Sequence, residues 1–485
     1  MSRSTAPGWL SWPVATLTVI AGLVASTIIV LAVRPSGLPS AAGSAPGSVA
    51  VSSAAGSPSA SAPPTGLAPR VIGAAIGAES GVLPKDAALA KRIAAVTATR
   101  LGTVTGSVVD LAGGSVLYDA GAATPMVPGS TLKLLTVTAA LEAMGPWHRF
   151  TTRVVSPSPG DIVLVGGGDP YLASTPSTGY PAPVTSATLA ASTAAALKAK
   201  GLTSVTLGYD DSLFSGPSWN PAWPKEYRDQ VATISSLWID QGRDPATSRF
   251  SSDPAGTAAR TFAAQLAKQG ITVRDADPGR VKAPTDAATI AEVQSWPLAT
   301  IVEQTLLESD NSAAEVLLRQ VALASGRPPT FTGGVDAVRQ RLSDLGIRLD
   351  GVQMLDGSGL ARSDKVSAAE LTALIRLAAA RPELRPLLDG LPTAAATGTL
   401  AYRFYLPGTG PGRGIVHAKT GTLTHVSSVA GYVRTDSGAL LAFAFLVNGA
   451  APDAKVTKTS VGTNDWDMRT YLDLVSSAIA GCGCS

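Results

Sequence analysis

The sequence predicts an α/β sandwich, an antiparallel sheet flanked by helices, with an inserted domain that interrupts it. Two strand-like runs joined at Ala112-Gly113 are followed by a helical pattern over 130–144. Close to the C-terminus, three strand patterns at 414–423, 427–435 and 439–448 precede a helical pattern at 466–480. A differently patterned region separates these two groups of elements, which is why we expect an interrupted sandwich.

The length of 485 residues exceeds what one hydrophobic core usually holds, so two or three domains are expected. Charged residues make up only 15% of the chain, and 38 Lys and Arg nearly balance 35 Asp and Glu. Phosphate binding requires clustered Lys and Arg, and the sequence contains no run of them. A nucleic-acid-binding surface is therefore not expected.

Residues 9–33 form an uncharged apolar stretch with Arg3 before it and Arg34 after it. A membrane span takes about 20 residues, whereas the apolar part of a cleaved signal peptide has about 7–15. We therefore expect a single-pass anchor in the cell membrane, with a cleaved signal peptide and a secreted protein as the alternative. Both place the rest of the chain outside the cytoplasm. Residues 35–69 are almost wholly Ser, Ala, Gly and Pro, which predicts a flexible stalk.

The region from about 151 to 293 differs from its flanks. Strand-like runs at 162–165 and 205–209 alternate there with Pro-rich loops and an amphipathic helix at about 262–269. We interpret this region as an insert.

A serine followed three residues later by a lysine offers the first candidate for chemistry, Ser130-Thr131-Leu132-Lys133. A serine hydroxyl needs a neighbouring base to become a nucleophile, and residues three apart share one face of a helix. At the start of a helix, backbone N–H groups can also stabilise a developing oxyanion. Taken alone, the pattern fits a helix-capping serine with an exposed lysine better.

A second polar group, Ser309-x-Asn311, lies between helical patterns at 297–307 and 312–324. It offers a hydroxyl that can pass a proton and an amide that can hold a peptide carbonyl, although such residues also gather at helix starts for capping alone. We predict a capping box from Ser312 to Glu315 at the second helix. A rival Ser218-x-Asn220 lies in a Pro-rich loop with no helix pair around it.

The third group is Lys419-Thr420-Gly421-Thr422, on a predicted strand. A cation and two hydroxyls on a strand suit a substrate carboxylate, and we expect the glycine to let the substrate backbone approach closely. An edge strand with a solvated lysine is the ordinary alternative.

The three groups in this order resemble the motif set of penicillin-binding proteins and serine β-lactamases. The long gap between Lys133 and Ser309 narrows the resemblance to the D-alanyl-D-alanine carboxypeptidase/endopeptidase family of DacB type (penicillin-binding protein 4, peptidase family S13). Further stretches that resemble this family begin at Gly166, Asp210, Leu306, Asp356 and Ala418, and the resemblance covers roughly residues 80 to 480.

The resemblance implies a penicillin-binding-protein/β-lactamase-like sandwich with its inserted domain between the first and second motifs. We expect an anchor or signal peptide at 1–34 and a stalk at 35–75. The first part of a transpeptidase-like domain follows at 76–150, the inserted domain at 151–295 and the second part of the transpeptidase-like domain at 296–480. A Cys-containing tail ends the chain at 481–485.

The resemblance also implies a serine-type D-Ala-D-Ala carboxypeptidase that trims peptidoglycan stem peptides and is acylated by β-lactam antibiotics. Ser130 would be the nucleophile and Lys133 its base, with a pKa lowered by burial and by the like charge of Lys419. Ser309 would relay the proton to the leaving amine, and Asn311 would bind the stem-peptide amide.

The terminal carboxylate would be held by Lys419, Thr420 and Thr422. Gly421 would also belong to the substrate-binding residues. Backbone N–H groups of Ser130 and Thr422 would form the oxyanion hole. No cofactor or metal is expected. His417 shares the face of Lys419 and is given at most a supporting role.

Two other functions remain as alternatives: a serine β-lactamase, and a cell-wall-binding protein of the same fold without catalysis. Carboxypeptidase and D,D-endopeptidase action are not separated by the sequence. Cys482 and Cys484 are compatible with a disulfide, free thiols or a partner contact. Asp356-Gly-Ser-Gly-Leu contains ordinary turn dipeptides, and we interpret it as structural.

Overall fold

The computed structural model describes residues 81–96, 101–275, 277–449 and 461–484, without the side chains of 461–467. The predicted anchor at 9–33 and stalk at 35–75 lie outside these residues. Within the described part of the chain, no helix has both the length and the apolar character of a membrane span.

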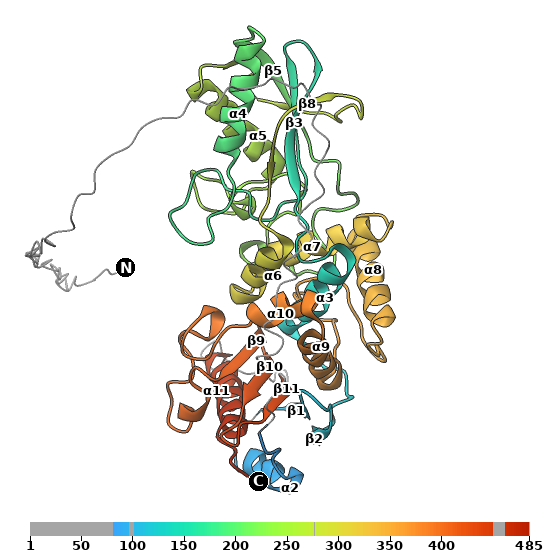
Figure 1. Cartoon of the computed structure of the whole chain (residues 1–485), viewed down its shortest axis with the longest axis vertical. Helices are drawn as coiled ribbons and strands as arrows, with labels where there is room; N and C mark the ends of the chain where they lie inside the picture. The colour runs from blue at the N-terminus through green and yellow to red at the C-terminus, as the bar shows by residue number, and fades with distance from the viewer. Residues whose placement is uncertain (1–80, 97–100, 276, 450–460, 485) are drawn as a thin grey trace, which may run out of the picture. The chain divides into compact units, whose positions relative to one another are not determined.

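The first sheet has five antiparallel strands and is built from both ends of the described chain (Figure 1). Its order is β2 (Val116–Ala120), β1 (Thr103–Asp110), β11 (Leu440–Asn448), β10 (Val426–Arg434) and β9 (Val416–Leu423). The predicted hairpin and the three C-terminal strands are therefore confirmed. Six consecutive side chains from Leu441 to Leu446 are fully buried, because helices cover both faces of the sheet.

The two helical layers bury opposite faces of this sheet. On one face, α3 (Lys133–Met144) and α9 (Ala368–Ala380) share a core with Ala430 and Ala442 of the strands. On the other face, α2 (Asp86–Ala94) and α11 (Val461–Ala480) share a core with Val429 and Phe443. The α/β sandwich is confirmed. Further helices pack around α3, namely α6 (Leu298–Leu307), α7 (Asn311–Ala324), α8 (Phe331–Asp344) and α10 (Arg385–Asp389).

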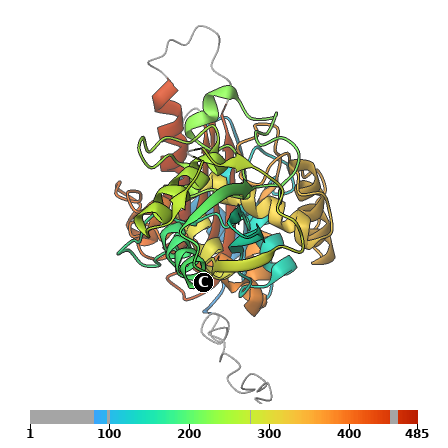
Figure 2. The same cartoon turned by 90° about the horizontal axis from the view of Figure 1, so that it is seen from above.

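A second, mixed sheet lies between α3 and α6 in the sequence. Its order is β6 (Thr272–Val273), β5 (Ser204–Asp210), β4 (Asp161–Val165), β3 (Thr151–Ser158) and β8 (Ala288–Gln294), with β7 (Gly279–Arg280) also paired to β5. Helices α4 (Ser186–Ala199) and α5 (Pro254–Lys268) bury its apolar side chains in a separate core. Figure 2 views this green and yellow part of the chain from above. The domain boundaries at 151 and 295 stay a prediction.

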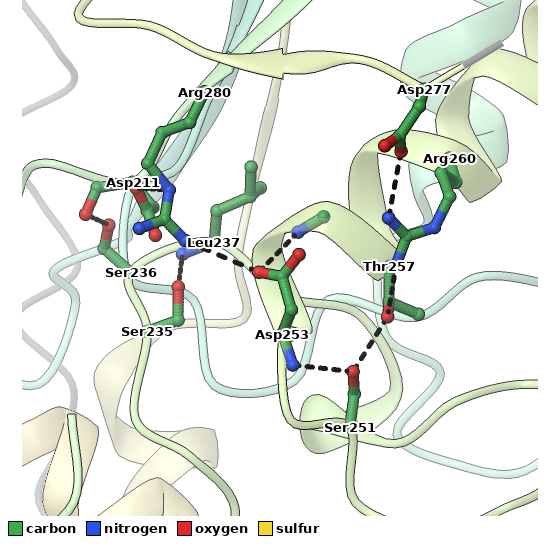
Figure 3. Close-up of polar contacts among 11 residues, drawn as sticks. Asp211, Ser235, Ser236, Leu237, Ser251, Asp253, Thr257, Arg260, Asp277 and Arg280 are labelled. Carbon is green, nitrogen blue, oxygen red and sulfur yellow. Dashed lines mark hydrogen bonds and ion pairs between the residues drawn. The ribbon is translucent and has the colours of Figure 1, made fainter.

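Ion pairs connect β7 and α5 to neighbouring segments of this second sheet (Figure 3). The Arg280 guanidinium lies 3.3 Å from a carboxylate oxygen of Asp211 and 3.4 Å from one of Asp253, which caps α5. Arg260 contacts Asp277 at 3.1 Å. The pairs of Arg280 with Asp253 and of Arg260 with Asp277 are largely solvent-exposed, and such pairs contribute little to stability.

Several short segments are 3₁₀ helices: η1 (Gly129–Leu132), η2 (Lys225–Asp229), η3 (Asp240–Gly242), η4 (Pro382–Leu384), η5 (Gly398–Leu400) and η6 (Gly410–Gly412). The predicted helix at 130–144 therefore begins as a 3₁₀ turn. Cys482 and Cys484 are joined as a disulfide.

The predicted capping box from Ser312 to Glu315 is wrong. Asp310 caps α7 instead, since its side chain accepts a hydrogen bond from the N–H of Ala313. Ser312 Oγ accepts from the N–H of Ala232 at 2.9 Å, and the Glu315 carboxyl group accepts from the N–H of Gly357 at 3.0 Å. Both side chains are thus used by distant parts of the chain.

Candidate active site

Ser130 and Lys133 are brought together as their spacing predicts. Ser130 lies in η1, and Lys133 is the first residue of α3, so one helical turn separates them. The Lys133 Nζ lies 2.9 Å from Ser130 Oγ. It also donates to Asn311 Oδ1 at 2.7 Å and to the carbonyl oxygen of Ser358 at 2.8 Å. The amine is therefore held in one orientation, toward the serine.

Burial sets the chemistry of Lys133, whose side chain has no exposed surface. Burial lowers its pKa to about 8, because a charged ammonium is disfavoured away from water. Asp356, Glu315 and Asp310 oppose this shift when they are ionised. Burial lowers the pKa of Lys133, as the sequence-based expectation has it. The charge of Lys419, the second expected cause, is not a cause of the shift at Lys133; instead, the charge of Lys133 lowers the pKa of Lys419.

Ser309 and Lys419 form a second pair that faces the first. Ser309 lies between α6 and α7 in the left-handed conformation, with φ of 57°. The fully buried Lys419 on β9 donates to Ser309 Oγ at 2.8 Å and to the carbonyl oxygen of Thr420 at 2.9 Å. Burial, and then the charge of Lys133, hold the pKa of Lys419 well below its usual value.

Asn311 connects the first pair to the insert. Its Oδ1 accepts from Lys133 Nζ, and its Nδ2 donates to the carbonyl oxygen of Gln230 at 2.9 Å. Gln230 follows η2 in the inserted region, so this region contributes directly to the site.

The glycine of the third motif serves packing within the protein. A Cβ on Gly421 would overlap the carbonyl oxygen of Pro128 and Ser428 Oγ and would lie 2.9 Å from the backbone nitrogen of Ser130. This glycine therefore lets β9 lie against the Ser130 segment. The expectation that it also lets the substrate backbone approach closely stays a prediction. Hydrogen bonds from Thr131 Oγ1 and Ser428 Oγ to the Pro128 carbonyl oxygen hold that contact.

A cleft of about 720 Å³ opens over these groups. Of the predicted residues, it is lined by Ser130, Ser309, Asn311, Thr420 and Thr422. The lysines lie beneath its surface, since both are fully buried.

The cleft also has lining residues that the motifs did not indicate. The inserted region supplies Glu226, Tyr227, Asp229 and Gln230, and the C-terminal part supplies Thr399, Arg403 and Arg469. They lie far from the motifs in sequence and have no fixed spacing to them. The only indication in the sequence was the position of the insert directly before the second motif, which places residues of the insert near the cleft.

The stretch that starts at Asp356 is a tight turn that also reaches the site, which corrects the purely structural interpretation. The Asp356 side chain is fully buried and accepts from the backbone N–H groups of Ser358, Gly359 and Ala361 at 3.1, 2.7 and 2.7 Å. The turn thereby presents the Ser358 carbonyl oxygen to Lys133.

The remaining candidates have structural partners. His417 stacks on Tyr432 with 4.8 Å between ring centroids, and its Nδ1 lies 3.0 Å from Thr393 Oγ1. In the rival Ser218-x-Asn220, the Asn220 amide donates to the carbonyl oxygen of Leu355 at 2.7 Å. These contacts explain both residues without a catalytic role.

The chain matches the model of the D-Ala-D-Ala carboxypeptidase 3 (S13) family over residues 87–250 and 241–466. It is 36% identical to carboxypeptidase DacB of Mycolicibacterium smegmatis, over 84% of this chain and 88% of that protein. It is 37% identical to a carboxypeptidase of Mycobacterium tuberculosis, over 80% of this chain and 86% of that protein.

Solved structures show the same fold. The crystal structure of penicillin binding protein 4 from Haemophilus influenzae matches with a TM-score of 0.64 and 21% identity, covering 81% of this chain and all of that one. Its complex with a β-lactam matches with a TM-score of 0.58, 22% identity and the same coverage. From the family model and the relatives of similar length, the chain belongs to the D-Ala-D-Ala carboxypeptidase 3 (S13) family.

Proposed function

We propose that this chain is a serine-type D-Ala-D-Ala carboxypeptidase that trims peptidoglycan stem peptides through an acyl-enzyme on Ser130. The observation that carries the proposal is the pair formed by Ser130 and the buried Lys133, 2.9 Å apart at the floor of the cleft. The names of the relatives, carboxypeptidase DacB and D-alanyl-D-alanine carboxypeptidase, support this activity.

Acylation begins when neutral Lys133 accepts the proton of Ser130 and the serine oxygen attacks the carbonyl carbon between the two D-Ala residues. The backbone N–H groups of Ser130 and Thr422 stabilise the resulting oxyanion. The packing of β9 against the Ser130 segment supports this role, because a Cβ on Gly129 would lie only 3.1 Å from the Thr422 nitrogen.

Departure of the terminal D-Ala requires a proton on its amine. Ser309 is suited to relay to this amine the proton that Lys133 took from Ser130, since its hydroxyl lies in the cleft and accepts a hydrogen bond from Lys419 Nζ. Thr420 and Thr422 line the cleft on the same strand as Lys419 and hold the terminal carboxylate through their hydroxyl groups. Asn311 binds the stem-peptide amide, and water then releases the acyl group.

Mass spectrometry with a labelled penicillin tests the proposal. The wild-type protein is expected to gain the mass of one penicillin, and Ser130→Ala is expected to gain none. An equal gain on both proteins would refute Ser130 as the nucleophile, and no gain on the wild type would favour a non-catalytic cell-wall-binding protein. Rapid turnover of penicillin would instead favour a serine β-lactamase.

Product analysis on defined muropeptides tests the substrate. Release of terminal D-Ala is expected from a carboxypeptidase, and cleavage of cross-linked dimers would add D,D-endopeptidase action. Intact muropeptides after incubation with protein that forms the acyl adduct would contradict the assignment.

We also propose that residues 9–33 anchor the protein in the cell membrane, with the cleft outside the cytoplasm. The length of the apolar stretch supports this location, as does the extracytoplasmic position of peptidoglycan. Recovery of the protein in the cytosolic fraction of lysed cells would contradict it.

A further inference from the structure

We infer that Trp223, in the inserted region, is a positioning residue for the base Lys133 and acts on it through Asp356. The inference rests on the proposed function and adds a requirement: the insert orients the catalytic base as well as lining the cleft.

The first contact is between the indole and a buried carboxylate. Trp223 is 4% exposed, and its Nε1 donates to Asp356 Oδ2 at 2.7 Å. Edge-to-face contacts with Trp219 and Phe331, at centroid distances of 5.1 and 5.3 Å, fix the plane of the indole ring. The direction of its N–H is thereby set before any substrate arrives.

The second step lies in the turn that Asp356 organises. One carboxylate oxygen accepts from the N–H groups of Ser358 and Gly359, and the other accepts from Ala361 and the indole. A buried carboxylate requires such donors, because leaving it unsatisfied is costly. The orientation of this carboxylate determines where the Ser358 carbonyl oxygen lies, 2.8 Å from Lys133 Nζ.

A parallel contact from the same inserted segment supports the inference. The Gln230 carbonyl oxygen accepts from Asn311 Nδ2, and Asn311 Oδ1 accepts from Lys133. Besides contacting Ser130, Lys133 Nζ donates to Asn311 Oδ1 and to the Ser358 carbonyl oxygen. The inserted segment thus holds both of them, one through Gln230 and the other through Trp223 and Asp356.

The charges that face Lys133 determine the expected change in pH dependence. They come from Asp356 in the turn, from Glu315 and Asp310 on α7 and its cap, and from Lys419 on β9; Asp364 lies beside Asp356. Without the indole donor, the turn no longer holds the Ser358 carbonyl oxygen in place, and the Lys133 ammonium loses an acceptor. Its charged form then loses stabilisation, so its pKa falls further.

Trp223→Phe tests the inference, since phenylalanine keeps an aromatic ring and removes only the N–H donor and part of the ring area. We expect the rate of acylation by a fluorescent penicillin to increase with pH to a plateau that is about tenfold lower than in the wild type. The pH at which the rate reaches half of its plateau should be lower than in the wild type. Penicillin affinity before acylation should change less than the rate. Thermal unfolding of each variant shows whether it is folded.

Trp238→Phe is the matched control. Trp238 is also buried, and its indole Nε1 donates to the Pro170 carbonyl oxygen at 3.2 Å instead of to the carboxylate of Asp356. We expect its pH profile to match the wild type.

If Trp223→Phe acylates like Trp238→Phe at every pH, the inference is wrong while the proposed function stands. If wild-type protein forms no adduct, the proposed function itself fails. Should Trp223→Phe not fold, Asp356→Asn provides the second test. The loss of its negative charge is likewise expected to move the rise to lower pH, and an unmoved profile would overturn the inference.

Discussion

At the residue scale, Lys133 shows how burial turns an ordinary side chain into a base. An exposed lysine has a pKa near 10.5 and is almost entirely protonated at neutral pH. Burial brings the pKa of Lys133 to about 8, although three carboxylates nearby act in the opposite direction. A substantial fraction of the amine is therefore neutral in mildly alkaline solution and can accept the proton of Ser130.

The acylation rate is accordingly expected to increase as pH rises through about 8 and then to level off, because only the neutral form of Lys133 is a base. Stopped-flow measurements with a fluorescent penicillin between about pH 6 and pH 10 would follow this rise. Ser130→Ala provides the background rate of β-lactam hydrolysis. A rate independent of pH over this range would contradict Lys133 as the base.

At the scale of elements, the site depends on the close approach of β9 to the Ser130 segment. Two glycines make that approach feasible, Gly129 in η1 and Gly421 in β9. The first has φ of 54°, a conformation that favours glycine, and the second leaves no space for a Cβ. The strand and the helix start are thereby positioned without side chains between them.

Gly421→Ala is expected to push β9 away from Ser130, since the obstacles are a backbone oxygen and a buried hydroxyl. The free energy of unfolding should decrease by about 1–3 kcal/mol, and acylation should slow more than tenfold. Urea unfolding and penicillin acylation measure the two effects. Gly279→Ala on β7 is the control, because a Cβ there meets nothing within 4 Å. Wild-type acylation by Gly421→Ala would show that the approach is unimportant.

At the scale of the whole molecule, buried ionisable groups make stability depend on pH. Burial raises the pKa of Glu315 to about 8 and that of Asp169 to about 7. The folded protein binds these protons more tightly than the unfolded chain, so their contribution to stability is lost as pH rises from about 4 through 8. Lys133 acts in the opposite direction above pH 8, because its folded pKa is lowered. We therefore expect the contribution of these three groups to stability to be smallest near pH 8.

Glu315→Gln should make the protein more stable than the wild type near pH 8 and change little near pH 5. Glutamine keeps an acceptor for the Gly357 N–H and cannot ionise, so the cost of a buried charge disappears. Thermal unfolding of both proteins at the two pH values measures the difference. Glu292→Gln, an exposed position on β8, is the control. The same shift in melting temperature at both pH values would contradict the argument.

The parts of the site that depend on local spacing could be predicted from the sequence. Ser130 and Lys133 are three residues apart, so any helical turn brings them together, and the short apolar runs of β10 and β11 predict strands from their composition. The order of the three motifs, compared with the family, indicated the fold and the activity.

Only the tertiary structure showed what surrounds these motifs. Ser312 and Glu315 have the spacing of a capping box, yet distant backbone groups recruit both side chains. Trp223 and Asp356 meet across 133 residues of sequence, and no local pattern records such a contact. The pKa of Lys133 follows from complete burial, which is a property of the packed molecule. The sequence by itself predicted which groups react, whereas long-range packing decided how these groups are oriented and how their pKa values are shifted.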